Sequence, residues 1–283
     1  MKQRSQGIFF IIMAAFCFAA MNLFVRSAGD LPTMQKCLFR NLVALAFVSI
    51  LLISSKEKFH FQKKSVPSLF IRSISGTIGL ILNFYAIDHL NISDATMLNK
   101  LSPFFAIIFS YSILRETANK VEWIAVIIAF AGSLLVIKPS FGMESIPAII
   151  GFLGGMCAGF AYTYVRKLGL QGERKEIIIF WFSGVSTLII LPFCITQYQP
   201  MSPLQIMWLT LAGIAATGGQ FCITKAYTKA PAKEISVFDY TQVIFAALLG
   251  FFFLAQIPDL YSFIGYLIII GVAVLKWFYN LKH

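Results

Sequence analysis

Lys100 and Asp239 carry opposite charges inside apolar stretches of the chain. A charged side chain near the centre of a bilayer costs about 2.5 to 3.5 kcal/mol on insertion scales, so it is expected to face a cavity or a partner. The Lys100 ammonium could hold an anionic group, and the Asp239 carboxylate could bind an amino group or carry a proton. These two residues are therefore the strongest candidates for a binding site.

The depth of these two residues can be compared from the sequence. Lys100 lies about seven residues from the edge of its apolar run, and Asp239 is expected at a similar depth in its own run, because Asn99-Lys100 and Asp239-Tyr240 are equivalent positions 140 residues apart. The two runs enter the membrane from opposite faces. At a helical rise of about 1.5 Å per residue each is roughly 10 Å deep, which leaves about 10 Å between them in a core of about 30 Å. We expect them on opposite sides of one central cavity rather than in a direct ion pair. Two other roles remain open, because Lys100 could extend to the membrane surface and Asp239 could pair with Lys225.

Uncharged polar residues within the apolar runs add to this candidate site, since a few convergent polar groups orient a small ligand in an apolar pocket. Hydrogen bonding between helices is the alternative role for each of them. The predicted substrate-binding residues are Asn22, Asn83, Asn99, Lys100, Tyr162, Gln220, Asp239 and Tyr240. No catalytic residue, metal site or cofactor is predicted.

Two arginines also lie within or beside the apolar runs. Arg40 could contact a ligand or serve the structure, and Arg72 is expected to meet lipid headgroups. Arg40 and Lys100 place two cations in the outer half of the membrane. They favour a substrate with an anionic group, since an ionised carboxylate or phosphate needs such partners in a low dielectric.

The composition excludes a water-soluble protein. Of the 283 residues, 58% are hydrophobic and 12% are charged, and the mean hydropathy is +0.79, whereas soluble domains carry about 25% charged residues. The net charge of +11 comes from basic residues dispersed between apolar runs, while a nucleic-acid surface gathers them on one face. The chain is therefore predicted to be an all-α polytopic membrane protein that binds no nucleic acid.

Ten runs have the length of about 20 mostly apolar residues that a membrane-crossing helix needs. The predicted spans are Gly7–Val25, Thr33–Ile53, Val66–Ile87, Ser93–Leu114, Val121–Ile137, Ser145–Val165, Ile177–Ile195, Pro203–Tyr227, Ile235–Leu254 and Leu260–Leu281. With the N-terminus inside, fifteen of the 23 Lys and Arg residues fall in cytoplasmic segments and two fall outside. Because cytoplasmic loops carry the excess of basic residues, both termini are predicted to be cytoplasmic.

Two local features of these spans concern packing and bending. Gly151, Gly155 and Gly159 recur every four residues and would let a neighbouring helix approach the sixth span closely. Pro103 removes a backbone hydrogen bond, so a kink is expected beside Lys100.

The two halves of the chain repeat one another at an offset of 140 residues. The matching pairs include Cys17 and Cys157, Gly79 and Gly219, and Ala86 and Ala226. Residues 1–140 and 141–283 are thus predicted to form two five-helix repeats. Because five is odd, the second repeat enters the membrane from the opposite side, and such inverted repeats are the architecture of many secondary transporters.

Several stretches carry a resemblance to a known family. They are Leu101-Ser102-Pro103-Phe104-Phe105 and Leu114-Arg115-Glu116 in the first half, and Phe238-Asp239-Tyr240 and Phe245–Gly250 in the second. With them, essentially the whole chain resembles two EamA domains of the drug/metabolite transporter superfamily. It departs at Gln256, where the family usually has Glu, and at Val243, which lacks the proline of Pro103. The resemblance implies a carrier of small metabolites that is proton-coupled, exchanging or facilitative, with a central cavity lined by helices 1, 3, 4, 6, 8 and 9.

These features together predict a secondary active transporter that moves a small organic metabolite across the bacterial cytoplasmic (inner) membrane by alternating access. The metabolite would be an amino acid, a carboxylate or a nucleobase-like compound. The alternatives are an exchanger or facilitator of a nucleoside-type metabolite such as S-adenosylmethionine and, in a different class, a multipass membrane enzyme or scaffold, although the sequence holds no catalytic motif. Expected partners are the metabolite, the lipid bilayer and protons, for which Asp239 and Glu234 are the candidate sites. The chain is expected to act as a monomer or homodimer.

Overall fold

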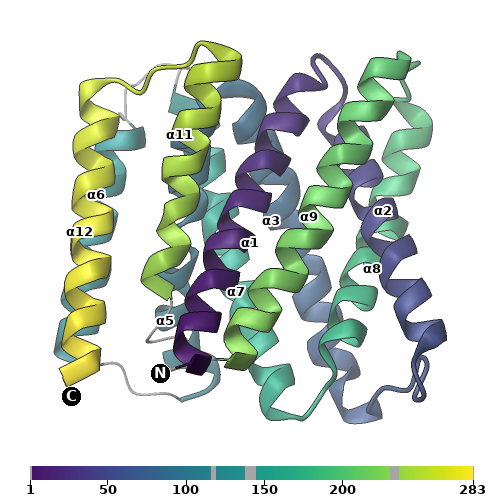
Figure 1. Cartoon of the computed structure of the whole chain (residues 1–283), viewed down its shortest axis with the longest axis horizontal. Coiled ribbons are helices and arrows are strands. Elements are labelled where there is room, and N and C mark those ends of the chain that lie inside the picture. The colour runs from purple at the N-terminus through teal and green to yellow at the C-terminus, as the bar shows by residue number, and fades with distance from the viewer. Residues whose placement is uncertain (1, 116–118, 138–144, 230–235, 283) are drawn as a thin grey trace.

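The computed structural model describes residues 2–115, 119–137, 145–229 and 236–282, and all regular structure in these ranges is helical. The helices stand side by side in one bundle (Figure 1). In chain order they are α1 (Lys2–Ser27), α2 (Thr33–Ser54), the 3-10 turn η1 (Lys63–Ser65), α3 (Val66–His89), α4 (Ile92–Asn99), α5 (Ser102–Ile113), α6 (Lys120–Ile137), α7 (Ile146–Leu170), α8 (Lys175–Thr196), α9 (Pro203–Lys229), the 3-10 turn η3 (Ser236–Tyr240), α11 (Thr241–Leu254) and α12 (Leu260–Lys282).

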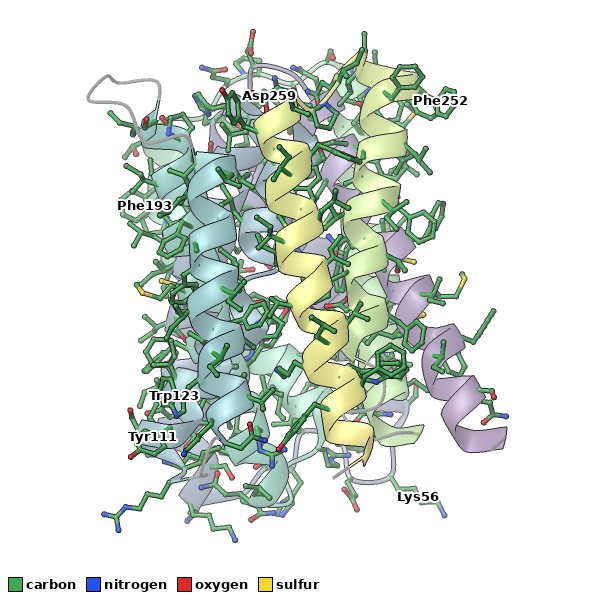
Figure 2. The ribbon with its side chains drawn as sticks, turned by 90° about the vertical axis from the view of Figure 1, so that its left-hand side faces the viewer. Lys56, Tyr111, Trp123, Phe193, Phe252 and Asp259 are labelled. Carbon is green, nitrogen blue, oxygen red and sulfur yellow. The ribbon has the colours of Figure 1, made fainter. Side chains whose placement is uncertain are left out.

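The outer surface of the bundle is apolar, as a membrane requires. Within the described residues, seven helices are long and apolar enough to cross a membrane, and Trp123–Ile137 and Phe238–Leu254 are shorter apolar helices. Phe193 and Phe252 are 50% and 73% exposed and point away from the bundle in Figure 2. An exposed phenylalanine belt of this kind is stable only against lipid, so the chain is a polytopic all-α membrane protein.

The predicted spans agree with the structure, except that two of them are divided. The fourth span is split into α4 and α5, with Lys100 and Leu101 between the helices. The ninth span begins as η3 and continues as α11. The break beside Pro103 confirms the expected kink, since proline offers no N–H to continue the ladder of the preceding helix. No proline lies beside the break at Tyr240, so the sequence did not indicate this break.

The most extensive helix contacts all join the first half of the chain to the second. The central pairs are α1 with α9 and α3 with α7, while α2 packs on α8 and α6 on α12. In Figure 1 the α6–α12 pair and the α2–α8 pair lie at opposite ends of the long axis, and α1 begins at the same end of the bundle at which α12 finishes. The two halves therefore enclose a shared interior. The boundary predicted at residue 140 lies outside the described residues, and the division into inverted repeats stays a prediction.

Glycines of α7 hold the broken helix in place. A Cβ atom at Gly155 would clash with the Leu98 carbonyl oxygen, and one at Gly159 would lie 2.7 Å from the Ser102 carbonyl oxygen. The close approach predicted for this glycine stripe is therefore confirmed. Since Leu98 and Ser102 flank the break, the stripe fixes the position of Lys100.

Candidate functional site

A cavity lies between the two halves at the middle of the bundle. It is lined from α1, α2, α3, α7, α8, α9, α11 and the α4–α5 break, which includes the six helices that the resemblance implies, together with α2 and α8. Its polar lining residues are Asn22, Arg40, Arg72, Asn83, Asn99, Lys100, Tyr162, Gln220 and Gln242. Those of the polar side chains that are buried need a partner in the protein or in a ligand.

Six of the eight predicted binding residues line this cavity, namely Asn22, Asn83, Asn99, Lys100, Tyr162 and Gln220. The other two, Asp239 and Tyr240, contact Lys100 directly. The structure thus brings the predicted set together, and its role in binding stays a prediction. The candidate proton site Glu234 and the family-motif residue Glu116 lie outside the described residues.

Lys100 and Asp239 form a buried ion pair. The Lys100 ammonium donates to Asp239 Oδ2 at 2.6 Å, and the two side chains are only 8% and 11% exposed. The Tyr240 hydroxyl donates to the Lys100 carbonyl oxygen at 3.1 Å. Both membrane spans are interrupted where these residues lie. The two backbones therefore approach one another, and polar groups at one break find partners at the other.

The expectation that Lys100 and Asp239 lie on opposite sides of the cavity without a direct pair is therefore wrong. The depth argument assumed two straight helices, whereas both helices are interrupted and the lysine side chain reaches across the remaining gap. Lys100 does not extend to the membrane surface either. The partner that the structure gives to Asp239 is Lys100, while the Lys225 ammonium lies over the Phe10 ring at 4.5 Å.

Arg40 and Arg72 form a second buried cationic group in the same cavity. They are 4% and 6% exposed, so the expectation that Arg72 meets lipid headgroups is wrong. Both guanidinium groups lie against Phe182, with Cζ at 5.5 Å from the ring centroid for Arg40 and at 3.9 Å for Arg72. Gly76 makes this possible, because a Cβ atom there would lie 2.8 Å from Arg72 Nη1 and 3.0 Å from the Phe182 ring.

The two arginines have few partners of their own. Arg40 donates to Asn41 Oδ1 at 2.7 Å, while Arg40 Nε, Arg72 Nε and Arg72 Nη1 are buried without a hydrogen-bond acceptor. No carboxylate pairs with either arginine in the described part of the chain. Unmatched guanidinium groups in a cavity are suited to bind an anionic group.

Sequence reasoning overlooked Phe182, one of the 29 phenylalanines in the chain, and placed Arg72 at the membrane surface. A usable signal for Arg72 was present in its spacing. Arg72, Gly76, Gly79 and Asn83 recur at helical intervals and therefore share one face of α3. That face is the one that lines the cavity.

At the end of the bundle away from the termini, polar contacts join helices of the first half of the chain. Lys36, buried in the first turn of α2, donates to Asp88 Oδ1 at 2.6 Å, and Arg26 donates to the Ile87 carbonyl oxygen at 3.1 Å. Asn22 donates to Thr96 Oγ1 at 2.9 Å. These contacts tie α1 and α2 to the end of α3, and α1 to α4.

A membrane bundle whose halves enclose a polar chamber is the architecture of a transporter. Comparison with known families identifies the kind. The EamA-like transporter family matches residues 5–138 and 145–277, so the chain belongs to this family of the drug/metabolite transporter superfamily.

Curated relatives match along nearly the full length. The chain is 30% identical over 271 residues to the pseudopaline exporter CntI of Pseudomonas aeruginosa, covering 95% of this chain and 94% of that protein. It is 26% identical to solute carrier family 35 member G1 of Mus musculus, covering 98% of this chain and 80% of the relative. A solved crystal structure with 17% identity superposes with a TM-score of 0.68 over 98% of both chains, which supports the fold. The protein is thus a membrane transporter.

Proposed function

We propose that this protein is a secondary active transporter that moves a small organic metabolite across the cytoplasmic membrane by alternating access. The observation that carries the proposal is the cavity itself, because its charged and polar lining comes from both halves of the chain. A binding site between two halves can be opened to either side when the halves rock against one another.

The proposed moving parts are the two inverted five-helix repeats, residues 1–140 and 141–283, with both termini cytoplasmic. At the end of the bundle away from the termini, Gln35 and Gln199 hydrogen-bond to one another between the halves, and the Ile92 N–H donates to Gln256 Oε1. A transporter must break such contacts once in each cycle and form others at the opposite end. With both termini cytoplasmic, this end would be the extracellular one.

The Lys100–Asp239 pair is the proposed coupling element. It joins the break between α4 and α5 to the junction of η3 and α11, so it links the two halves at the cavity. A proton on Asp239, or an amino group of the substrate beside it, would weaken the attraction for Lys100 and release the link. Either event would make movement of the halves depend on occupancy of the site.

The substrate classes that we propose to test are amino acids, small carboxylates, nucleobases and S-adenosylmethionine. The relative with the highest identity above is named as an exporter, which supports measuring outward transport as well as uptake. Protons are the proposed co-substrate, and a monomer or homodimer is the proposed assembly.

The test uses full-length protein in proteoliposomes with labelled members of these classes. A carrier should show saturable flux and counterflow, in which unlabelled substrate on one side accelerates entry of label from the other. An imposed pH gradient should change the rate in the wild type, and Asp239→Asn should remove that dependence, whereas Arg166→Gln, at an exposed position near the end of α7, should keep it. Flux that does not saturate, or no flux above protein-free liposomes, would contradict the proposal.

A further inference from the structure

One face of α3 lines the cavity from end to end. Arg72, Gly76, Gly79, Leu80 and Asn83 all belong to the lining, and their spacing places them in one row along the helix. The row begins with a cation, continues with two glycines and a leucine, and ends with an amide. The cavity is therefore elongated along α3 and differs in chemistry at its two ends.

The arginine end offers hydrogen-bond donors in a fixed orientation. The Arg72 guanidinium lies 3.9 Å from the Phe182 ring centroid, and a guanidinium that stacks on a ring keeps its in-plane N–H groups free for a ligand. Arg72 Nε and Nη1 and Arg40 Nε are buried without an acceptor. An oxyanion, either carboxylate or phosphate, supplies the acceptors and the charge that these groups lack.

The asparagine end offers acceptors. Thr96 donates its hydroxyl proton to the Ile92 carbonyl oxygen, so the Asn22 amide must act as the donor to Thr96 Oγ1. Asn22 Oδ1 is then the atom left without a partner, and Asn83 Oδ1 is buried in the same condition. A ligand that satisfies both oxygens must carry N–H or O–H groups at this end.

The two ends are about 10 Å apart. The Arg72 guanidinium lies level with Gly76, and the seven residues from Gly76 to Asn83 rise by about 10 Å along the helix. Asn22 lies five residues before the end of α1, and Asn83 lies six before the end of the parallel helix α3, so both belong to the same end of the cavity.

We propose that the cavity binds an elongated organic acid, with its oxyanion at Arg40 and Arg72 and a hydrogen-bond donor group about 10 Å away at Asn22 and Asn83. This inference rests on the proposed function and names the substrate class of the same site. It excludes compact molecules such as simple α-amino acids, whose charged groups lie too close together to reach both ends. It equally excludes substrates without an anionic group.

The same arrangement predicts an unusual effect on the empty protein. Two guanidinium groups without carboxylate partners destabilise the unliganded state, because charge is buried without compensation. Replacement of Arg72 by glutamine should therefore raise the thermal midpoint of the empty protein and weaken ligand binding at the same time. A residue with a purely structural role would lower the midpoint.

The experiment measures thermal midpoints of detergent-purified full-length protein with four probes. 6-Aminohexanoate carries an acid and an amine at its two ends, 6-aminohexanamide lacks the acid, hexanoate lacks the amine, and glycine is short. We expect 6-aminohexanoate to stabilise the wild type most strongly. Arg72→Gln should weaken its binding about 10- to 150-fold, the range for a lost hydrogen bond to a charged group, while the exposed Arg166→Gln should bind as the wild type does.

Each contrary outcome is decisive. Equal stabilisation by 6-aminohexanamide would overturn the oxyanion site, equal stabilisation by glycine would overturn the two-ended site, and no shift with any probe would overturn both. A thermal midpoint of empty Arg72→Gln below that of the wild type would overturn the claim that the arginine charge is uncompensated. Binding without flux in proteoliposomes would contradict the transport proposal alone, whereas saturable flux of a neutral compound that these acids do not inhibit would contradict this inference alone.

Discussion

Two buried cationic regions face one cavity, and they differ in how their charges are compensated. Lys100 is neutralised by Asp239 at 2.6 Å, whereas Arg40 and Arg72 have an aromatic ring, Phe182, where a carboxylate would be expected. The first region is complete in charge, although Asp239 Oδ1 is buried without a hydrogen-bond partner. The second is complete only when something else supplies a negative charge.

The difference also extends to the backbone. Lys100 lies at a helix break that is held by the Tyr240 hydroxyl and by the glycine stripe of α7, while Arg40 and Arg72 project from the continuous helices α2 and α3. A complete pair at a rigid junction suits a structural link between the halves. Two arginines without an anionic partner, on long side chains, suit the binding of a ligand. Mutations in the two regions should therefore change stability in opposite directions.

The largest effect is expected from Asp239→Asn. Removal of one partner from a buried ion pair leaves the other charge uncompensated and typically costs about 3 to 5 kcal/mol. We expect the free energy of unfolding to fall by this amount, measured as a large drop in the thermal midpoint of the purified protein.

The matched control is the double variant Lys100→Met with Asp239→Asn. It removes both charges at nearly constant volume, so it should recover most of the lost stability, because no uncompensated charge is left buried. A double variant as unstable as Asp239→Asn would show that Asp239 acts through contacts other than the charge of Lys100.

A smaller loss is expected from Gly155→Ala, which tests the packing that positions Lys100. The new methyl group would meet the Leu98 carbonyl oxygen, and overpacking of a tight contact costs about 1 to 3 kcal/mol. Gly271→Ala on α12 is the control, because nothing lies within 4 Å of its Cβ position. Alanine there should be neutral or slightly stabilising, since it favours a helix over glycine. Equal effects at the two positions would show that the close packing of α7 does not stabilise the break beside Lys100.

The spans could be predicted closely from the sequence, because a membrane helix must be apolar over its whole length and that constraint is visible residue by residue. The break beside Lys100 was announced by Pro103. The equivalent break at Tyr240 was not, since Val243 stands where a second proline would have marked it.

The site was only partly predictable for a physical reason. Which residues are polar within a span is plain in the sequence, and most of these residues do line the cavity. The point that the end of a long side chain reaches is not evident from the sequence. Arg72 lies near the edge of its apolar run and could equally have reached the surface, and only Gly76 one turn later gives its guanidinium space to fold inward against Phe182.

Gly76→Ala isolates that space without changing any charge. The methyl group would displace the Arg72 guanidinium from the ring, so binding of 6-aminohexanoate should weaken by about tenfold, which corresponds to about 1.4 kcal/mol. The midpoint of the empty protein should move less than in Arg72→Gln, because the charge remains. Gly218→Ala provides the comparison, since its Cβ would meet Cys17 Sγ at an ordinary 3.6 Å. Undiminished binding by Gly76→Ala would mean that the stacked position of Arg72 is not the binding position.

The smallest effect is expected where an ion pair is exposed. Glu57 lies between α2 and α3 and pairs with Arg174 at 3.2 Å, with side chains that are 66% and 25% exposed. Pairs of this kind contribute about 0 to 1 kcal/mol and are weakened by salt. Glu57→Gln should therefore shift the midpoint slightly at low ionic strength and not at all at high ionic strength. The loss in Asp239→Asn should persist at both, because the solvent ions that screen Glu57 do not reach a buried pair. If salt abolished both differences, Lys100 and Asp239 would be open to solvent, and the contrast between the complete and the incomplete cationic region would disappear.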